Sequence, residues 1–293
     1  MLALLLAAPF AQAQSVPSQA VDVDTVITAS ITSEPPARLV IIIDDLGHQL
    51  SNGRRAADLP GAVTLSILPY TGHGDRIAKR GHQAGKEIML HAPMSNLANQ
   101  PLGAGGLTPE LSEEEFRATL TASLLQIPHV NGVNNHMGSE LTQYRLQMGW
   151  LMEELKAQTL YFVDSRTSSD TVAASVAKEY GLPHLSRQVF LDNEPTREAI
   201  EERFNTAVSR AEKDGLAVAI GHPYKATLDF LTEVLPTLGE QNIELVTVSA
   251  ALPPEQAHLE TQDVAVETVP ETAALVKEAA GSQTLTSTPL SAM

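Results

Sequence analysis

The side chains best suited to chemistry in this sequence are acids and histidines that stand at the ends of short apolar runs. Asp44 and Asp45 follow five apolar residues, His91 ends a second run, His136 stands beyond a third, and His222 follows a fourth. Carboxylates and histidines are the ligand types of a catalytic zinc, which uses three protein ligands and leaves one position open for water. A carboxylate and a histidine outside the ligand set can act as base and acid.

A fifth polar stretch, Asp164-Ser165-Arg166-Thr167-Ser168, follows the apolar residues that end at Val163. These five polar ends are spread over about 180 residues of sequence. An unpaired carboxylate costs several kcal/mol to bury, so acids are expected where a strand leaves the core. The carboxyl ends of parallel strands share one edge of the sheet, where α/β proteins place their ligands. We therefore expect the five stretches to face one cleft.

The elements that position these residues alternate between apolar strands and amphipathic helices. Strands are predicted at 39–44, 63–68, 86–91, 130–135, 159–164, 186–191, 216–221 and 243–248. Helices are predicted at 49–58, 73–84, 112–126, 142–157, 170–180, 195–214 and 226–239. Such β–α repeats with short connections favour an α/β fold with a barrel-like parallel sheet, with a doubly wound open sheet as the alternative. The sequence has no Gly-x-Gly-x-x-Gly or Walker loop, which weakens a nucleotide-binding version of either fold.

Composition narrows the function classes. The 293 residues contain no cysteine, which excludes disulfides, thiolate metal sites and thiol nucleophiles. Nineteen basic residues against 35 acidic ones give a net charge of −16, and no basic cluster is present. A surface that binds nucleic acid must be basic, so nucleic acid is excluded as a partner.

The two ends of the chain differ from its middle. Residues 1–13 resemble a secretory signal peptide that ends in Ala-Gln-Ala, and its apolar run is too short to span a bilayer. The mature protein is therefore expected in the periplasm or secreted, without stable membrane insertion. Residues 14–37 are predicted to be a linker, 38–250 a single folded domain, and 251–293 an acidic disordered tail.

The motifs together resemble those of the polysaccharide deacetylases, and their pattern looks like the divergent branch of that family. Residues 39–47 are similar to the first family motif, a strand that ends in Asp-Asp-Gly, and residues 80–91 look like the approach to the second. Residues 133–139, 163–168 and 221–223 continue the pattern in order. The resemblance covers nearly all of residues 38–250. It implies a distorted (β/α) barrel of the NodB-homology type, here with about seven parallel strands, and a divalent metal, usually zinc.

The resemblance also implies roles for single residues. Asp44 matches the general base, Asp45 a metal ligand, and His91 the first histidine of a His-x-x-x-His motif. The sequence departs from that motif at Ser95, so the missing ligand is expected from another strand, with His136 as the best candidate.

Two further positions match catalytic residues of the family. His222 matches the histidine that acts as general acid. Asp164 and Arg166 fall where the family keeps an acid that orients catalytic groups, and we expect Arg166 to pair with Asp44 or Asp164.

Two functions follow as hypotheses. The first is a metal-dependent hydrolase, a carbohydrate deacetylase that removes acetyl or other acyl groups from an envelope polysaccharide through zinc-activated water. The second is a non-catalytic barrel that binds a glycan or an envelope protein, with the acidic tail as its interaction segment. Ser95 favours the second, whereas the combination of acid and base favours the first. A peptidoglycan amidase or protease would need a similar zinc site, but no His-Glu-x-x-His helix is present.

Overall fold

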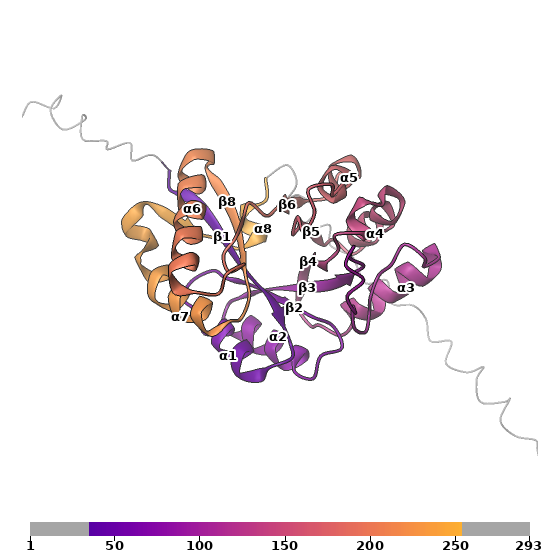
Figure 1. The fold of residues 1–293 in the computed structure, drawn as a ribbon, viewed down its shortest axis with the longest axis horizontal. Coiled ribbons are helices and arrows are strands. Elements are labelled where there is room, and N and C mark those ends of the chain that lie inside the picture. Colours follow the sequence, from indigo (N-terminus) through magenta and orange to yellow (C-terminus); the bar gives the residue numbers. More distant parts are fainter. Residues whose placement is uncertain (1–34, 254–293) are drawn as a thin grey trace, which may run out of the picture.

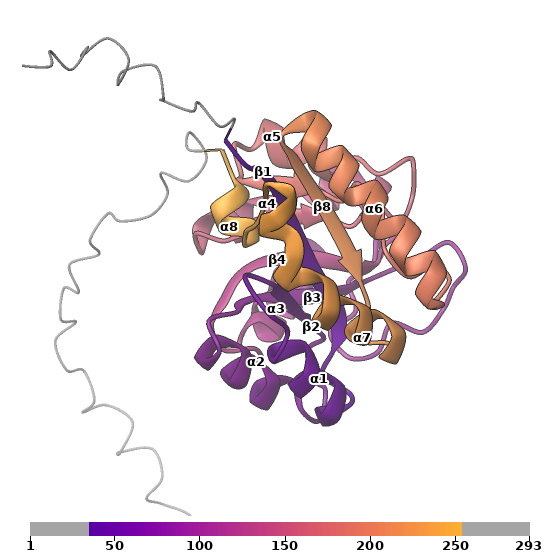
Figure 2. The ribbon, with the colours of Figure 1, turned by 90° about the vertical axis from the view of Figure 1, so that its left-hand side faces the viewer.

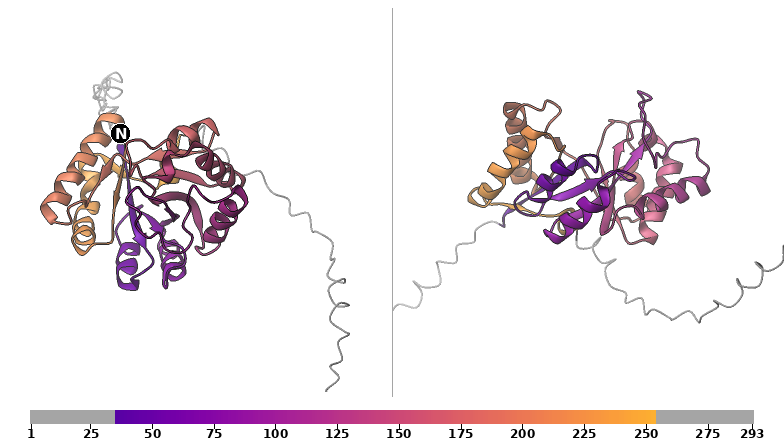
Figure 3. Two further views of the ribbon diagram at one scale, coloured as in Figure 1. Left: turned by 45° about the vertical axis from the view of Figure 1, so that its right-hand side comes forward. Right: turned by 90° about the horizontal axis from the view of Figure 1, so that it is seen from below.

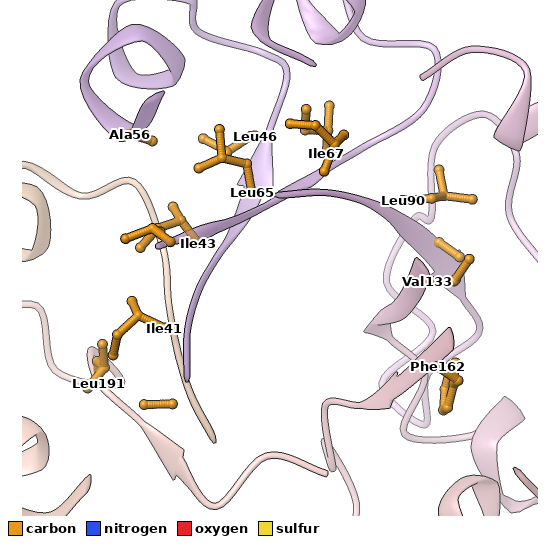
Figure 4. Packing of buried hydrophobic residues seen from close by; sticks show 14 of the residues in the cluster. Ile41, Ile43, Leu46, Ala56, Leu65, Ile67, Leu90, Val133, Phe162 and Leu191 are labelled. Carbon is orange, nitrogen blue, oxygen red and sulfur yellow. The ribbon is translucent and has the colours of Figure 1, made fainter. Parts of the chain in front are cut away.

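The central strand, β1 (Ala37–Leu46), is apolar because both of its faces are buried. The structure is a computed structural model and describes residues 35–253. Ile41 and Ile43 belong to a core cluster that also holds helix residues, such as Ala56 (Figure 4), whereas Val40 and Ile42 belong to a second cluster of mainly strand residues. Side chains alternate along a strand, so each face of β1 supplies one of these two cores.

Around β1 the chain alternates strands and helices. The strands are β1, β2 (Thr64–Ile67), β3 (Glu87–Met94), β4 (Val130–Met137), β5 (Tyr161–Asp164), β6 (His184–Ser186), β7 (Val189–Phe190), β8 (Leu216–Gly221) and β9 (Ile243–Leu245). The α-helices are α1 (Leu50–Ala57), α2 (Gly74–Gln83), α3 (Glu113–Leu124), α4 (Arg145–Ala157), α5 (Ala173–Glu179), α6 (Arg197–Asp214), α7 (Lys225–Val234) and α8 (Val248–Ala251). Short 3₁₀ turns lie at η3 (Leu141–Gln143) and η4 (Leu235–Gln241).

Within residues 35–253 the paired strands of this sheet are parallel, and the strand order is β6-β5-β4-β3-β2-β1-β8-β7, with β9 paired to the start of β1. Helices α1 to α7 lie around the outside of the curled strands (Figure 1), and two other directions show the same arrangement (Figures 2 and 3). The predicted distorted (β/α) barrel of parallel strands is thus confirmed.

The predicted strand 186–191 differs from the structure, which divides this region into β6 and β7. The reason is a change of partner: β6 pairs with β5, whereas β7 pairs with β8. The two edge strands of the sheet, β6 and β7, are therefore neighbours in sequence. If β6 and β7 are counted as one interrupted strand, the strand order β6-β5-β4-β3-β2-β1-β8-β7 contains seven strands, as predicted.

The predictions for the chain ends cannot be compared with the fold. The signal peptide 1–13, nearly all of the linker 14–37 and nearly all of the tail 251–293 lie outside the described residues. Within residues 35–253, no helix is long and apolar enough to cross a membrane.

Helix α8 closes the amino-terminal end of the barrel and is held there by Glu87 at the start of β3. The Glu87 carboxylate accepts hydrogen bonds from Val248 N (2.8 Å) and Ser249 N (3.1 Å), and Thr64 Oγ1 donates a third at 2.9 Å. Val248 and Ala251 pack in the same interior cluster as Val40 and Ile42. A buried carboxylate thus connects β2, β3 and the last described helix.

Replacing Glu87 with alanine is expected to lower the free energy of unfolding by about 2–4 kcal/mol, because Thr64 Oγ1 and two backbone N–H groups lose their acceptor in a buried site. Urea unfolding of the full chain measures this. Glu244→Ala, at an exposed position of β9, is the matched control and should change the midpoint little. Equal midpoints for the two variants would contradict the role assigned to Glu87.

Candidate active site

Three potential metal ligands from three strands meet at the carboxyl end of the barrel. Asp45 Oδ1 lies 3.2 Å from His91 Nε2 and 2.9 Å from His136 Nδ1. The two histidine nitrogens are 3.2 Å apart. The sequence predicted this trio as the metal ligands, and the structure brings them together.

Local backbone structure explains the convergence. In the β3–β4 pairing, His91 lies opposite Asn134 and Pro93 opposite His136, so both histidines sit near the same end of the sheet. Asp44 and Asp45 lie within β1 rather than after it, at a register shift between Ile43 and Leu46. Asp45 has φ +55°, the left-handed region that is strained for most residues and is typical of functional sites.

The turn after β1 requires glycine. Gly47 has φ +132°, and a Cβ there would lie 2.1 Å from Thr71 Oγ1. The close approach of the β1 and β2 loops therefore depends on the absence of a side chain at this position.

The spacing of the three donor atoms fits a zinc ion. Adjacent ligand atoms of a tetrahedron with bonds of about 2.0–2.1 Å are about 3.3 Å apart, close to the separations in this trio. Asp45 Oδ1 is buried and, among the described residues, has no hydrogen-bond partner of acceptable geometry despite the nearby nitrogens. A buried carboxylate oxygen without a partner, this close to two histidine nitrogens, suits a bound cation.

Asp44 lies beside the trio and is buried, with a side chain 3 % exposed. Its Oδ2 is 3.6 Å from His91 Nε2, and its Oδ1 accepts a hydrogen bond from Asn134 Nδ2 at 2.9 Å. Burial raises the pKa of Asp44, against the opposing attraction of His91 and His222. A carboxylate with a raised pKa takes up a proton more readily than an exposed one, as a general base requires.

Charge coupling is strong across the trio. Burial alone would raise the pKa of Asp45, but the nearby imidazoles of His136 and His91 hold it well below its usual range. Burial alone would lower the pKa of His91, but Asp44 and Asp45 raise it. Asp45 is therefore ionised, and a metal competes with a proton for His91.

Asn134 connects the metal trio to Asp44. Its Oδ1 accepts from His91 Nδ1 (2.7 Å) and Ser66 Oγ (2.6 Å), and its Nδ2 donates to Asp44 and, at 3.2 Å, to Ser165 Oγ. An acceptor at Nδ1 places the Nδ1 proton of neutral His91 there and leaves the Nε2 lone pair free for a metal. Asn134 lies in the motif stretch 133–139, but the sequence alone predicted no role for it.

Replacing Asn134 with alanine is expected to weaken zinc binding about 10–100-fold, the usual effect of removing the partner that orients a metal ligand. Titration of the full-length protein with zinc measures this. Asn135→Ala is the matched control: Asn135 is also buried, but its hydrogen bonds go to Met137 O and Ser165 N. Equal zinc affinity in the two variants would contradict the role of Asn134.

His222 follows β8 and forms a pair with Asp192 that sequence reasoning missed. His222 Nδ1 lies 2.8 Å from Asp192 Oδ1, while His222 N and Thr227 Oγ1 donate to Asp192 Oδ2 at 2.6 and 2.7 Å. The Asp192 side chain is fully buried. Asp192 directly follows the predicted strand 186–191, so the same strand-end signal that identified Asp44 could have found it.

The pair tunes His222 as an acid. Burial alone would lower the pKa of His222, but the hydrogen bond to Asp192 and the carboxylates of Asp44 and Asp45 raise it to about 9. His222 Nε2 faces the trio, 3.9 Å from Asp45 Oδ2. A cationic imidazole thus points its second nitrogen toward the metal ligands.

Asp164 and Arg166 behave differently from the prediction. Asp164 is buried and accepts from Arg166 N (2.8 Å) and Thr171 Oγ1 (3.0 Å), so it fixes the loop after β5. The expected ion pair of Arg166 was wrong: Arg166 is exposed, and within residues 35–253 no ion pair joins it to Asp44 or Asp164.

Arg187, which sequence reasoning missed, lies where the cation was expected. Its guanidinium donates to Ser165 O (2.5 Å) and Arg166 O (2.6 Å) and stacks 3.9 Å from the centre of the Phe190 ring. Burial lowers the pKa of Arg187 to about 10, although Asp164 acts in the opposite direction. The charge next to Asp164 therefore comes from the segment between β6 and β7.

Two pockets adjoin the trio and share His48 at their border. The His222 pocket, about 230 Å³, lies over the ends of β8 and β1 and is lined by Asp45, His48, Gln49, Asn52, His222 and Tyr224, among others. The His136 pocket, about 360 Å³, lies over β2 to β4 and is lined by Tyr70, Pro93, Pro101, Leu102 and His136, among others. The trio thus borders space for a ligand on two sides.

Comparisons with known proteins agree with the fold and the motifs. The divergent polysaccharide deacetylase family matches residues 41–252. The uncharacterized protein YibQ of Escherichia coli K12 is 34% identical over 224 residues, 76% of this chain and 70% of that protein. An uncharacterized protein of Haemophilus influenzae is 32% identical over 210 residues, 72% of this chain and 75% of that protein. The crystal structure of the uncharacterized protein ATU2773 from Agrobacterium tumefaciens shares the fold, with a TM-score of 0.71 at 23% identity over 75% of this chain and 91% of that one.

Proposed function

The chain belongs to the divergent polysaccharide deacetylase family, and on that premise we propose that it is a metal-dependent hydrolase that removes acetyl or other acyl groups from an envelope polysaccharide. The observation that carries the proposal is the meeting of three sets of groups at one cleft. These are a metal-ligand trio, a buried carboxylate beside it, and a histidine held by a buried aspartate. A cleft that only binds a glycan needs no such combination of base and acid.

The trio Asp45, His91 and His136 would hold the ion, zinc in this proposal, in the tetrahedral geometry that their spacing suits. When bound, such an ion lowers the pKa of water toward neutrality and polarises an acyl carbonyl. Asp44, outside the trio, accepts the proton of the attacking water. Asn134 keeps Asp44 and His91 in place through its two-sided hydrogen bonding.

His222 supplies the proton for the leaving group. Its Nε2–H faces the trio, and Asp192 orients the ring through Nδ1. As the bond between the acyl carbon and nitrogen breaks, the imidazolium protonates the amine, which would otherwise leave as a poor anion. Asp164 and Arg187 have an indirect role, because they fix the loop that carries Ser165.

The alternative function is a non-catalytic barrel that binds a glycan or an envelope protein. Ser95 favours it, because this residue replaces the second histidine of the family motif. The Ser95 Oγ is buried and has no hydrogen-bond partner among the described residues. His136 from the next strand answers this objection, since it completes the donor trio from another position.

We further propose that the protein is exported to the periplasm or secreted, with a glycan as its partner. The proposal is supported by the apolar start of the sequence, with its Ala-Gln-Ala end, and by the net charge of −16, which disfavours nucleic acid. The acidic segment 251–293 is proposed as a contact for an envelope protein.

The proposal predicts that the zinc-loaded full-length protein releases acetate from N-acetylated glycans. Asp44→Asn should lower kcat by about 10²–10⁴, the range for loss of a general base, with zinc content unchanged. Acetate release and elemental analysis measure the two quantities. Asp170→Asn, which changes an exposed acid at the same end of the barrel, is the control and should retain activity. Zinc binding without acetate release from any glycan would favour the binding protein instead.

A further inference from the structure

We infer that the His136 pocket is an acyl-chain site and that the protein hydrolyses amides of glycans whose acyl groups are longer than acetyl. This inference rests on the proposed hydrolase function and specifies its substrate class. It concerns the part of the cleft that lies away from His222, between the loops after β2 and β3 and His136 on β4.

The first argument is size. The methyl group of an acetyl takes about the volume of one water molecule, about 30 Å³. The His136 pocket measures about 360 Å³, roughly twelve times as much and within the range of small-ligand sites. The structure therefore offers far more room beside His136 than an acetyl group fills.

The second argument is the chemistry of the walls. The lining is mainly aliphatic and aromatic, with Pro69, Tyr70, Pro93, Pro101, Leu102 and Ala104 among its residues. Of its few polar groups, the Thr71 hydroxyl already donates to Leu68 O at 2.9 Å. A sugar ring would bring several hydroxyl groups that find few partners here, whereas a hydrocarbon chain needs none. Burying such a chain yields about 0.8 kcal/mol for each CH₂ group.

The third argument is direction. His222 gives its proton to the leaving nitrogen, so the sugar that carries this nitrogen lies on the His222 side. The pocket there offers Gln49, Asn52 and the Tyr224 ring, which suit a hydroxylated ring. The acyl carbon lies between the two pockets, and its chain then extends to the other side, into the His136 pocket.

The pocket wall is fixed by close packing. Tyr70 has φ +56°, and a Cβ on Gly105 would lie 2.9 Å from Tyr70 Cε2. The loop that carries Leu102 and Ala104 thus packs against Tyr70 without space for a larger residue at Gly105. A preformed wall of this kind selects chain length without the cost of ordering a loop.

The reaction balances as an ordinary hydrolysis. The water oxygen forms a bond to the acyl carbon, and the bond between this carbon and nitrogen breaks. Asp44 receives one water proton and His222 donates one to the nitrogen. The products are a carboxylic acid with its alkyl chain, which retains the second water proton until it ionises, and an amino sugar.

Two substitutions test the inference through chain-length selectivity in the zinc-loaded full-length protein. Substrates are chitobiose derivatives with N-acetyl, N-butyryl or N-hexanoyl groups. Ala104→Trp fills the pocket from an exposed position and should lower kcat/KM for hexanoyl at least 10-fold relative to acetyl. Leu102→Ala enlarges the pocket and should raise kcat/KM for hexanoyl relative to acetyl. Ala98→Trp, exposed in the same loop but outside the pocket lining, is the matched control and should leave the ratio unchanged.

A second readout does not depend on catalysis: hexanoate binding to the metal-free protein, which Ala104→Trp should weaken and Ala98→Trp should not. Hydrolysis of acetyl alone by the wild type, with equal ratios in all variants, would overturn the acyl-chain site but leave the hydrolase intact. An equal loss for all three acyl groups in Ala104→Trp would also overturn it and assign the pocket to sugar. Without hydrolysis of any substrate the proposed function fails, and hexanoate binding alone then decides the pocket.

Discussion

Replacing His136 with alanine is expected to reduce the zinc content of the purified full-length protein from about one ion per chain to almost none. His136 supplies one of only three protein ligands, and loss of a direct ligand should exceed the 10–100-fold effect of losing its orienting partner. His91→Ala should have the same effect, because both nitrogens lie about 3 Å from Asp45 Oδ1. Elemental analysis after incubation with excess zinc measures the change.

The pH dependence of zinc affinity follows from the raised pKa of His91. Below that pKa the imidazole carries a proton that zinc must displace, so zinc affinity should fall as the pH is lowered from 8 to 6. His82→Ala removes an exposed histidine that stacks on His129, and it should retain zinc like the wild type. Full zinc content in His136→Ala would remove the ligand assignment, and no zinc in the wild type would favour the binding-protein alternative.

The second large effect is expected at His222. His222→Gln should lower kcat by about 10²–10⁴, because the leaving nitrogen loses its proton donor. The zinc content should stay unchanged, since His222 is not part of the donor trio. Steady-state kinetics on an acylated glycan, together with elemental analysis, separates this result from loss of the metal.

Replacing Asp192 with asparagine tests how His222 is tuned. His222 acts as an acid only while protonated, so activity should fall as the pH rises through its pKa, about 9 in the structure. Without the Asp192 carboxylate this pKa falls, and the alkaline limb of the pH profile should move to lower pH. A metal ion bound nearby would lower the pKa of His222 in the wild type and in the variant alike. The alkaline limb of the variant would still lie at lower pH than that of the wild type.

An exposed acid provides the control for the pH profile. Asp214→Asn, at the end of α6, should leave the alkaline limb where the wild type has it. An Asp192→Asn variant whose limb does not move would show that Asp192 has only a structural role, even if its kcat is reduced.

The sequence by itself determined the strands and the ends at which chemistry gathers. Apolar runs such as residues 39–43 identify buried strands, and the cost of burying an unpaired carboxylate places Asp44 and Asp45 at a strand end. Both signals are local, so they can be recognised without knowing the fold. Motif resemblance added the trio, including His136 as a substitute from another strand.

Only the tertiary structure decided which of these groups touch. Asn134 reaches Asp44 across 90 residues of sequence, and Asp192 reaches His222 across 30. Arg187, rather than Arg166, brings positive charge beside Asp164. Such pairs depend on strand register and on the curl that sets β8 beside β1, and a change of register by one residue would turn each side chain to the opposite face of the sheet. Strand ends are therefore local properties of a sequence, whereas the partners of each side chain are properties of the assembled barrel.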